Sequence, residues 1–416
     1  MLPFARFQRP AALALAAFLA CSAAQADLVE ADAAYDRGDY DVALSEYRTL
    51  ADGGLARAQA MLGSMYRSGT GVDPNAALAR EWYTLAAEQG HPGAQVNLGH
   101  MYDTGEGVNP DKEAAADWYR RAALQGNAAA QFNLGNLYDF GEGVEPSKTQ
   151  ALEWYARAAR GGLADAMLRL AVMYDRGDGI DASPAQALTW YRHAAENDNA
   201  IAQTLLGIRY DQGNGVEQDK VKALKWYRLA ADQGNADARF YVGFMYDVGD
   251  GVAEDNAKAA KWYRLAADQG LDRAQANLGL LHQLGEGVAK DNIEALRWYR
   301  QAAEQGYAPA QYNIGNLYYS GDGVPQNKTE AANWYRKAGE RGFADAQVLL
   351  GLMYYQGEGV EEDPVQAHAW WSLAAEQGKA LAVSNRDSLD ETLTPEQLAQ
   401  SGAIAASLRS ASSAKP

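Results

Sequence analysis

The residues of this chain that could carry out chemistry are few, and they are not grouped as a catalytic site requires. The histidines show no H-E-x-x-H motif and no other metal-binding spacing, and no G-x-S-x-G motif is present. They are His91, His100, His193, His282 and His368. The one cysteine is Cys21, close to the N-terminus. We therefore expect no catalytic residue, no bound metal and no cofactor, and the sequence argues against an enzyme.

One aspartate recurs at the same place in five successive segments. These residues are Asp103, Asp139, Asp175, Asp211 and Asp247, each 36 residues after the one before. Carboxylates at this interval can meet lysine or arginine side chains along an extended partner. Solvated positions near a helix end explain the same pattern without any partner.

A repeat of 36 residues sets the elements that position these side chains. Tryptophan occurs without insertion or deletion at Trp82, Trp118, Trp154, Trp190, Trp226, Trp262, Trp298, Trp334 and Trp370. One unit is too small to bury its own apolar face, so the units must stack and share one elongated core. A regular stack has no single cleft built from distant parts of the chain, and the period therefore predicts a binding scaffold.

Each unit is predicted to begin with a helix that ends at a glycine turn. In the first full unit, Ala58, Leu62 and Tyr66 share one helical face, and the position of Ala58 is alanine in all nine units. Gly63 is expected to allow close contact between helices. The helix should end at 69–72, Gly-Thr-Gly-Val, where the first glycine forms the C-cap and the valine folds back onto the apolar face. We assign no nucleotide site to this G-x-G pattern.

A second helix is predicted to start three residues after that valine, where every unit has a residue suited to an N-cap. These residues are Asn75, Asp111, Ser147, Ser183, Asp219, Asp255, Asp291, Asn327 and Asp363. Ala79, Tyr83 and Ala86 mark its inner face. The adjacent pair Trp82 and Tyr83 is expected to fill the space that the small alanines leave.

The N-terminus has the pattern of a secretory signal peptide over residues 1–26. Arg6 and Arg9 precede an apolar run over 11–20, and Ala24-Gln25-Ala26 forms a small-residue cleavage site. A lipoprotein site at Cys21 is the alternative, but Phe18 occupies the place where such sites normally have leucine, so the sequence favours cleavage near Ala26. We expect a periplasmic or secreted protein without an integral membrane segment.

The acidic balance restricts the partners. The formal net charge is −17, and nucleic acid and anionic membrane surfaces are poor partners for such a surface. A protein or extended peptide partner that carries basic residues suits it better.

The unit A-x-x-x-L-G-x-x-Y-x-x-G-x-G-V, followed by an N-cap and A-x-x-W-Y-x-x-A-A-x-x-G, resembles the Sel-one-like repeat, a branch of the tetratricopeptide superfamily. The resemblance covers the chain from Ala58 to Leu381. It implies an all-α fold, a right-handed α-solenoid of helix-turn-helix repeats. We expect nine repeats over 55–381, a tetratricopeptide-like capping hairpin over 27–54, in which Gly38-Asp39-Tyr40 makes the turn, and capping helices with a frayed tail over 382–416.

The resemblance also implies where a ligand binds. Tetratricopeptide relatives can hold a peptide backbone with asparagines of the first helices, on a concave wall. The matching residues are Asn97, Asn133, Asn136, Asn277, Asn313 and Asn316, and the aromatic or histidine side chains around them are Phe132, Phe240, Phe244, Tyr312, Tyr319 and His100. These rings are recognition anchors if they are exposed, and core if they pack between units.

The expected function is a non-enzymatic scaffold of the bacterial cell envelope that binds proteins or peptides through this concave face. An envelope carbohydrate-binding protein or hydrolase is the alternative, because aromatic groove residues also suit sugar stacking.

The fourth unit departs from the repeat at three positions. Ala171 replaces the helix glycine, Ile180 replaces the valine and Asp198 replaces the last glycine. We expect a local change of curvature near 166–201.

Overall fold

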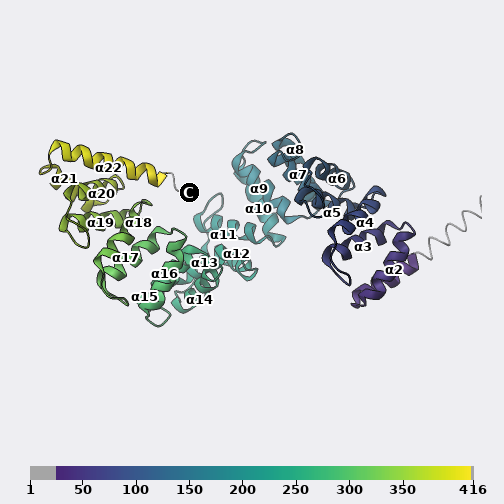
Figure 1. Cartoon of the computed structure of the whole chain (residues 1–416), viewed down its shortest axis with the longest axis horizontal. Coiled ribbons are helices and arrows are strands. Elements are labelled where there is room, and N and C mark those ends of the chain that lie inside the picture. The colour runs from purple at the N-terminus through teal and green to yellow at the C-terminus, as the bar shows by residue number, and fades with distance from the viewer. Residues whose placement is uncertain (1–24, 414–416) are drawn as a thin grey trace, which may run out of the picture. The chain divides into compact units, whose positions relative to one another are not determined.

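A computed structural model describes residues 25–413, and these residues form helices without a strand. From residue 56 onward the helices come in pairs, one pair per 36-residue unit (Figure 1). The first helices are α3 (Ala56–Ser68), α5 (Pro92–Thr104), α7 (Ala128–Phe140), α9 (Ala164–Arg176), α11 (Ala200–Gln212), α13 (Ala236–Val248), α15 (Asp272–Leu284), α17 (Ala308–Ser320) and α19 (Ala344–Gln356). The second helices are α4 (Ala76–Glu88), α6 (Lys112–Leu124), α8 (Lys148–Arg160), α10 (Pro184–Glu196), α12 (Lys220–Asp232), α14 (Asn256–Ala267), α16 (Asn292–Glu304), α18 (Lys328–Gly339) and α20 (Pro364–Glu376). The predicted all-α solenoid fold is confirmed.

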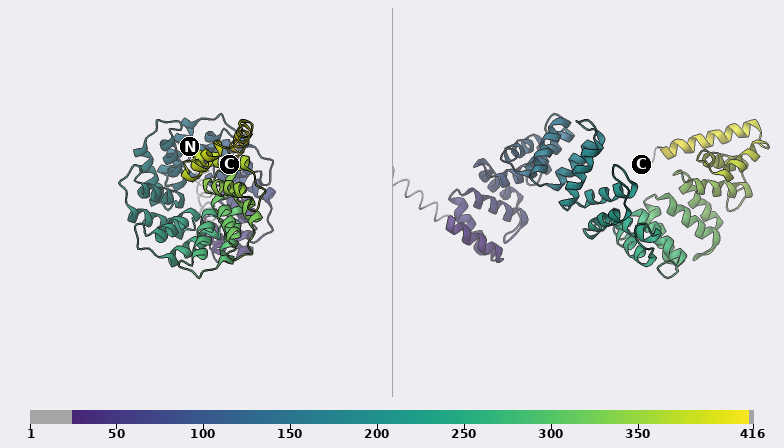
Figure 2. Two further views of the ribbon diagram at one scale, coloured as in Figure 1. Left: turned by 90° about the vertical axis from the view of Figure 1, so that its left-hand side faces the viewer. Right: turned by 180° about the vertical axis from the view of Figure 1, so that it is seen from behind.

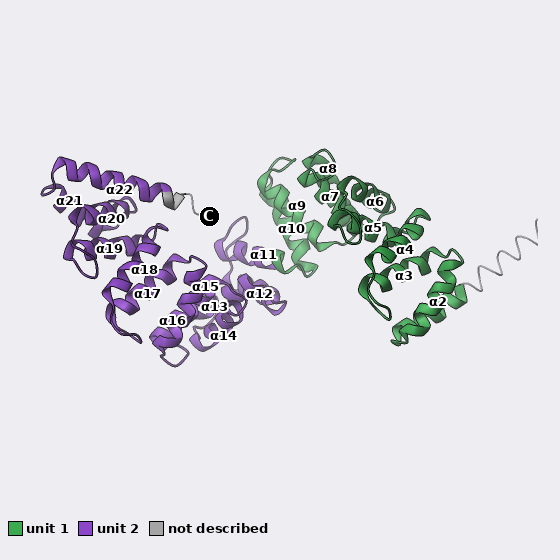
Figure 3. Ribbon diagram, in the orientation of Figure 1, with its two compact units in different colours: residues 1–202 green, residues 203–416 purple. Residues whose placement is uncertain are grey.

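The chain divides into two compact units, residues 1–202 and 203–416 (Figure 3). Within each unit, the two helices of a repeat pack against each other, as α5 and α6 do, and a second helix packs against the first helix of the next repeat, as α6 does against α7. The division follows directly on the fourth repeat, which carries Ala171, Ile180 and Asp198. Asp198 has a positive φ of 60° at a place where other repeats have glycine. The change of curvature expected there stays a prediction.

The glycine turns have the predicted conformation. Gly69 ends α3 in the left-handed region with φ 74°, and Val72 packs against the buried residues of the first repeats. The second glycine of the turn is required by its φ and, except at Gly215, also by close packing. A side chain on Gly107, for example, would place its Cβ 2.7 Å from the backbone of Ala76, at the start of the preceding second helix.

All nine predicted N-caps of the second helices are confirmed. Asn75 accepts a hydrogen bond from the backbone of Leu78, and Asp291 accepts from Ile293 and Glu294. Each of the other seven accepts from the backbone N–H three residues ahead, or two and three ahead at Asp363. These bonds satisfy backbone donors that the first turn of a helix leaves open.

The core is built from alanines and from the tyrosine of each Trp-Tyr pair. The nine alanines at the position of Ala58 are fully buried, and Tyr83 is 1 % exposed. The tryptophans are less buried than expected: Trp154, Trp298 and Trp370 are buried, and the others, including Trp226, are partly exposed. Lysine or arginine side chains lie over several of the tryptophan rings. The guanidinium carbon of Arg121, for example, is 4.4 Å from the ring centroid of Trp118.

A buried glutamine joins each repeat to the one before it in most of the chain. Gln95 of α5 donates to the carbonyl of Ala87 at the end of α4 (3.0 Å) and accepts from Gln125 (2.8 Å). The same bond to the carbonyl eight residues earlier is made by Gln59, Gln131, Gln275, Gln311 and Gln347. This role of the glutamines was not predicted from the sequence.

Further helices stand before and after the repeats. A helix over residues 25–36 and α2 (Tyr40–Asp52) form a hairpin whose turn contains Gly38, with φ 81°. After the repeats, α21 (Ala380–Asp390) and α22 (Pro395–Ser413) pack on α20, and Figure 2 shows α22 in yellow across the last helices. Thr394 and Gln397 cap α22 reciprocally.

The predicted leader lies almost entirely outside the described residues, which begin at residue 25, and Cys21 lies outside them altogether. None of the helices within 25–413 combines the length and the apolar composition that a membrane crossing needs.

Candidate interaction surface

The predicted site residues lie on the outward side of the first helices, which we call the first-helix face. In α7 this face carries Phe132, Asn133, Asn136 and Asp139, all partly buried. The corresponding positions of α13 carry Phe240, Phe244 and Asp247. The spacing of these residues places them on one side of each helix because three or four residues make one helical turn.

The tyrosines of the second helices reach this face with their hydroxyl groups. The hydroxyl of Tyr155 donates to Asn136 Oδ1 over 2.8 Å, with Asp139 Oδ2 3.4 Å away, and the hydroxyl of Tyr335 donates to Asn316 Oδ1 over 2.7 Å. Burial of its ring, and then Asp139, raise the pKa of Tyr155. Each hydroxyl therefore stays protonated and serves as a donor at neutral pH.

The other four predicted asparagines also contact their own chain. Asn277 donates to the hydroxyl of Tyr263 over 3.0 Å, while Tyr263 donates to Asp247 over 3.0 Å. Burial raises the pKa of Tyr119 and of Tyr299, and the nearby amides of Asn133 and Asn313 oppose that rise. Asn97 lies 3.5 Å from Arg67. The amide oxygens of Asn136 and Asn316 are thus engaged by tyrosine, whereas their NH₂ groups remain available to a ligand.

The predicted aromatic anchors differ in exposure. Phe132, Phe240 and Tyr312 are partly buried because each ring packs tilted against the tyrosine of its own repeat, with centroids 5.7, 5.6 and 5.8 Å apart. Phe244 is 41 % exposed. The hydroxyl of Tyr319 donates to Glu358. Among the predicted aromatic residues, Phe244 therefore exposes the largest fraction of its side chain to a partner.

Three aspartates of the ladder are paired within the chain. Asp103 lies 2.5 Å from the ammonium group of Lys112, and Asp139 lies 2.5 Å from that of Lys148. Asp211 lies 2.7 Å from Lys220. Each lysine is the first residue of the second helix and follows its aspartate by nine residues. These lysine partners were not predicted, although the spacing is constant. Pairing with carboxylates raises the pKa of Lys112 and Lys220.

The remaining two ladder positions have no lysine at the start of the second helix. Asp175 lies 3.5 Å from the hydroxyl of Tyr191, and its repeat has Pro184 there. The repeat of Asp247 has Asn256. Burial, and then Glu286 and Glu254, raise the pKa of Asp247, while the hydrogen bond from Tyr263 lowers it.

Apolar side chains are exposed beside Asp247. Phe244 and Val248 of α13 are 41 % and 52 % exposed, and Leu280 and Leu284 of α15 are 40 % and 52 % exposed. In both helices the two residues are one turn apart. Clustered exposed apolar residues mark interaction sites more often than isolated ones do.

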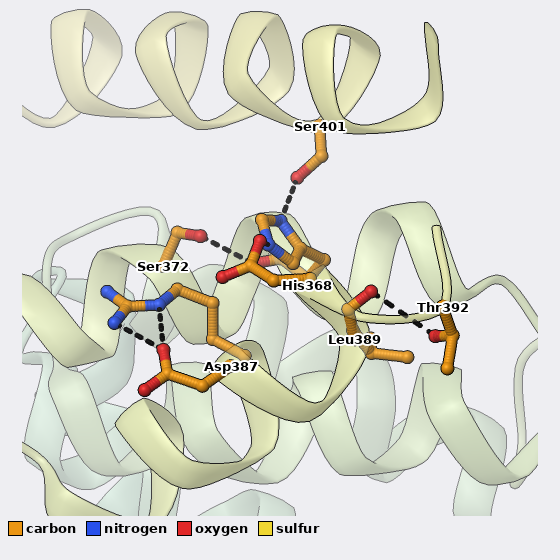
Figure 4. A network of polar contacts seen from close by, with 8 residues as sticks. His368, Ser372, Asp387, Leu389, Thr392 and Ser401 are labelled. Atoms are coloured by element: carbon orange, nitrogen blue, oxygen red, sulfur yellow. Dashed lines mark hydrogen bonds and ion pairs between the residues drawn. The ribbon is translucent and has the colours of Figure 1, made fainter. Parts of the chain in front are cut away.

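The structure also brings a histidine, an aspartate and a serine together at the last repeat, and Figure 4 shows His368 facing Ser401. His368 of α20 lies with Nδ1 2.7 Å from Ser401 Oγ of α22 and with Nε2 2.9 Å from Asp390 Oδ1 of α21. That these three side chains meet was not predicted from the sequence. His368 stands where most other repeats have leucine or alanine, and this replacement is the signal that was missed.

The burial of this cluster determines what it can do. Ser401 is fully buried between helices, and His368 is 8 % exposed. A nucleophilic serine must reach a substrate carbonyl and stand beside oxyanion donors, and a hydroxyl enclosed between helices cannot. The arrangement instead joins α20, α21 and α22 through a side chain with hydrogen bonds on both ring nitrogens. Within residues 25–413, no group of three or more histidine, cysteine, aspartate or glutamate side chains is placed to hold a metal ion.

Known proteins share this architecture. The chain is similar to the crystal structure of c5321, a protective antigen of uropathogenic Escherichia coli strains with an SLR fold, at 37 % identity and a TM-score of 0.81 over 94 % of this chain and 86 % of that one. It is also similar to a Sel1 repeat protein from Oxalobacter formigenes, at 34 % identity and a TM-score of 0.58 over 74 % of this chain and 89 % of that one. A search of curated proteins found no match.

The family model of the Sel1 repeat matches nine consecutive segments. They are residues 56–91, 92–127, 128–163, 164–199, 200–235, 236–271, 272–307, 308–343 and 344–379. Sel1 and tetratricopeptide-like repeats are typical of scaffolds for protein–protein interaction. With these matches over most of its length, the chain belongs to the Sel1 repeat family.

Proposed function

We propose that this protein is a non-enzymatic scaffold that binds a protein or peptide partner through its first-helix face. The observation that carries the proposal is the combination on this face of amide NH₂ groups, as at Asn136 and Asn316, with exposed apolar side chains such as Phe244. An extended peptide offers both a backbone carbonyl for an amide donor and side chains for an apolar surface.

The regular packing supports a binding role over a catalytic one. Polar side chains of this face are bonded to tyrosine hydroxyls or to lysines in nearly equivalent ways from repeat to repeat. A catalytic site requires groups that differ in role and converge on one reacting atom. The cluster of His368, Asp390 and Ser401 is the nearest approach to such a group, and its serine is enclosed.

The alternative of a carbohydrate-binding protein or hydrolase has less support. Sugar stacking needs an aromatic ring with one face open, but Phe132, Phe240 and Tyr312 lie against tyrosines of their own repeats. Peptide binding makes no such demand on these rings.

The proposed location is the bacterial cell envelope or the exterior, reached through the signal peptide at 1–26. The E. coli protein c5321, which matches most of the chain, is described as a protective antigen. A place where antibodies can reach the protein is consistent with export.

Photo-crosslinking from the first-helix face tests the proposal. A photoreactive amino acid at Asn136 or Phe244 should crosslink a defined protein in the cell envelope of the native host, and the same group at Lys261, an exposed residue of a second helix, should not. Crosslinks of equal strength and identity from both faces would contradict binding through the first helices. Retention of the protein on cell-wall glycan, without any protein crosslink, would favour the carbohydrate alternative.

A further inference from the structure

In two repeats, a lysine at the start of the second helix joins carboxylates of neighbouring repeats. Lys112 Nζ lies 2.5 Å from Asp103 Oδ1 and 2.7 Å from Glu142 Oε2. Lys220 Nζ lies 2.7 Å from Asp211 Oδ1 and 2.7 Å from Asp250 Oδ2. The first acid comes from the first helix and the second from the glycine turn of the next repeat. The fold therefore places one ammonium group between two acids.

One repeat keeps both acids and lacks the cation. Asp247, Asn256 and Glu286 stand one 36-residue period after Asp211, Lys220 and Asp250. The asparagine carries no charge, and its buried Oδ1 has no hydrogen-bond partner. Burial, and then Glu286 and Glu254, raise the pKa of Asp247, and no lysine or arginine within residues 25–413 forms an ion pair with Asp247 or Glu286. This repeat thus has an uncompensated negative pair where the preceding repeat holds the ammonium group of Lys220.

Apolar surface surrounds the pair. Asp247 lies between Phe244 and Val248 on the outward side of α13, and both neighbours are exposed. Leu280 and Leu284 occupy the equivalent positions of α15, and both are exposed as well. The hydroxyl of Tyr263, bonded to Asp247 and to Asn277, connects the two helices below this surface.

We propose that this part of the first-helix face binds a partner segment in which a lysine or arginine is flanked by apolar residues. The cation lies between Asp247 and Glu286, in the place of the missing lysine, and the flanking side chains cover Phe244, Val248, Leu280 and Leu284. The proposal rests on the proposed scaffold function and names its partner chemistry. The net charge of −17 favours the approach of a basic segment and disfavours a second copy of this chain.

Selection from a random peptide library displayed on phage, with the full chain as target, tests the proposal. Peptides enriched by the wild-type protein should contain lysine or arginine next to leucine, isoleucine or phenylalanine. A fluorescently labelled peptide of the enriched sequence then allows affinities to be compared by fluorescence anisotropy.

Two substitutions at equivalent positions provide the decisive comparison. Asn256→Lys supplies the cation from within, as Lys220 does one repeat earlier, and should weaken peptide binding about tenfold or more because the ammonium site is then filled. Asn292→Lys is the matched control, since its repeat has Gln283 in place of the aspartate, and should leave the affinity unchanged. Asp247→Asn should weaken binding as Asn256→Lys does.

The outcomes separate this proposal from the scaffold function. Enriched peptides without basic residues, or equal affinity of the wild type and Asn256→Lys, would overturn the partner chemistry while leaving the scaffold function in place. Enrichment of no peptide would overturn the partner chemistry too, and the absence of any crosslinked envelope protein would extend that failure to the scaffold function. If Asn256→Lys lost the circular dichroism of the folded protein, the affinity of Asp247→Asn would decide.

Discussion

The ring of Tyr155 lies directly against the Cα of Gly135, so that a methyl group on that glycine would come within 2.7 Å of Tyr155 Cε1. The same contact recurs in the other repeats that have glycine at this position, for example between Gly279 and Tyr299, except in the last repeat, where Gly351 faces Trp371. Glycine is unfavourable inside a helix, and this contact is the reason that the repeat keeps it. The fourth repeat has Ala171 there, and its Tyr191 is 4 % exposed where most others are fully buried.

Gly135→Ala should destabilise the protein. The gain in helix propensity is about 1 kcal/mol, and overpacking against Tyr155 costs typically about 1 to 3 kcal/mol, so the overpacking is expected to win. The measurement is the midpoint of urea unfolding. Gly402→Ala in α22 is the control, because nothing lies within 4 Å of the added Cβ, and it should stabilise by about 0.5 to 1 kcal/mol. A more stable Gly135→Ala protein would show that the ring moves away freely.

The tryptophans and tyrosines of the second helices should differ in their contribution to stability. Tyr227 is fully buried and Trp298 is 2 % exposed, whereas Trp226 is partly exposed. Replacement of Trp298 by alanine should lower the free energy of unfolding by about 3 to 5 kcal/mol, and replacement of Tyr227 should lower it by a similar amount. The loss at Trp226 should be clearly smaller. Thermal unfolding followed by circular dichroism measures the order. An equal loss at Trp226 and Trp298 would contradict it.

The sequence predicted the fold well because each repeat signals its elements locally. The N-caps, the αL glycines and the alanine positions act within a few residues of one another, and nine copies average out exceptions such as Ala171. The relative burial of Trp226 and Tyr227 could not be predicted in this way. Both are large aromatic residues on one helix, and their burial depends on the angle at which the next helix passes.

Gln95→Met should loosen the contact between the first and second repeats. Gln95 is 4 % exposed and bonds both the carbonyl of Ala87 and the side chain of Gln125. Methionine fills a similar volume, as Met167 does in the fourth repeat, but it removes both hydrogen bonds of Gln95. The carbonyl of Ala87 keeps only its backbone donors, such as the N–H of Gly90, and we expect a cost of about 0.5 to 1.5 kcal/mol for each lost bond. Hydrogen exchange of the amides at the end of α4 and in α5 should become faster than in α17. Unchanged exchange would mean that another donor or water takes over.

The candidate site was predicted in part. The asparagines and aromatics do lie on the first helices, because periodicity alone fixes which side of a helix a residue occupies. Their partners were not predicted. Tyr155 meets Asn136 from another helix at a distance of 19 residues, and Lys112 meets Asp103 across the turn. The same spacings between these residues recur in the sequence, but only the angle at which the two helices pack shows that the side chains touch.

His368→Leu and Ser401→Ala should release the last helix. Each change removes one end of the hydrogen bond between α20 and α22 and leaves the other end buried without a partner, at a cost of about 1 to 3 kcal/mol. Hydrogen exchange in α22 should accelerate in both variants, while exchange in α3 stays as in the wild type. The double variant should cost less than the sum of the two single changes, because both groups of the pair are then removed. Additive effects would show that the two side chains do not depend on each other.

Asp247→Asn and Glu106→Gln should change the stability with opposite signs, and both effects should depend on pH. Burial, and then Glu286 and Glu254, raise the pKa of Asp247. The ionised carboxylate therefore destabilises the fold at pH 7. This destabilisation is relieved as the pH falls through the raised pKa and the carboxylate becomes protonated. Asparagine can still accept the hydrogen bond of Tyr263. We therefore expect Asp247→Asn to melt at a higher temperature than the wild type at pH 7, with a gain that shrinks towards pH 4.

Glu106 has the reverse linkage, since its hydrogen bond with Arg67 lowers its pKa. The ionised Glu106 stabilises the fold above the ordinary glutamate pKa, and this stabilisation is lost as the pH falls through the lowered pKa. Glu106→Gln should therefore melt at a lower temperature than the wild type at pH 7, and the two melting temperatures should converge in acid. Melting temperatures of the three proteins, measured from pH 7 to pH 4 at one ionic strength, test both signs. A loss of stability in Asp247→Asn at pH 7 would mean that a cation already compensates this aspartate, and it would remove the basis for a partner's lysine or arginine at that place.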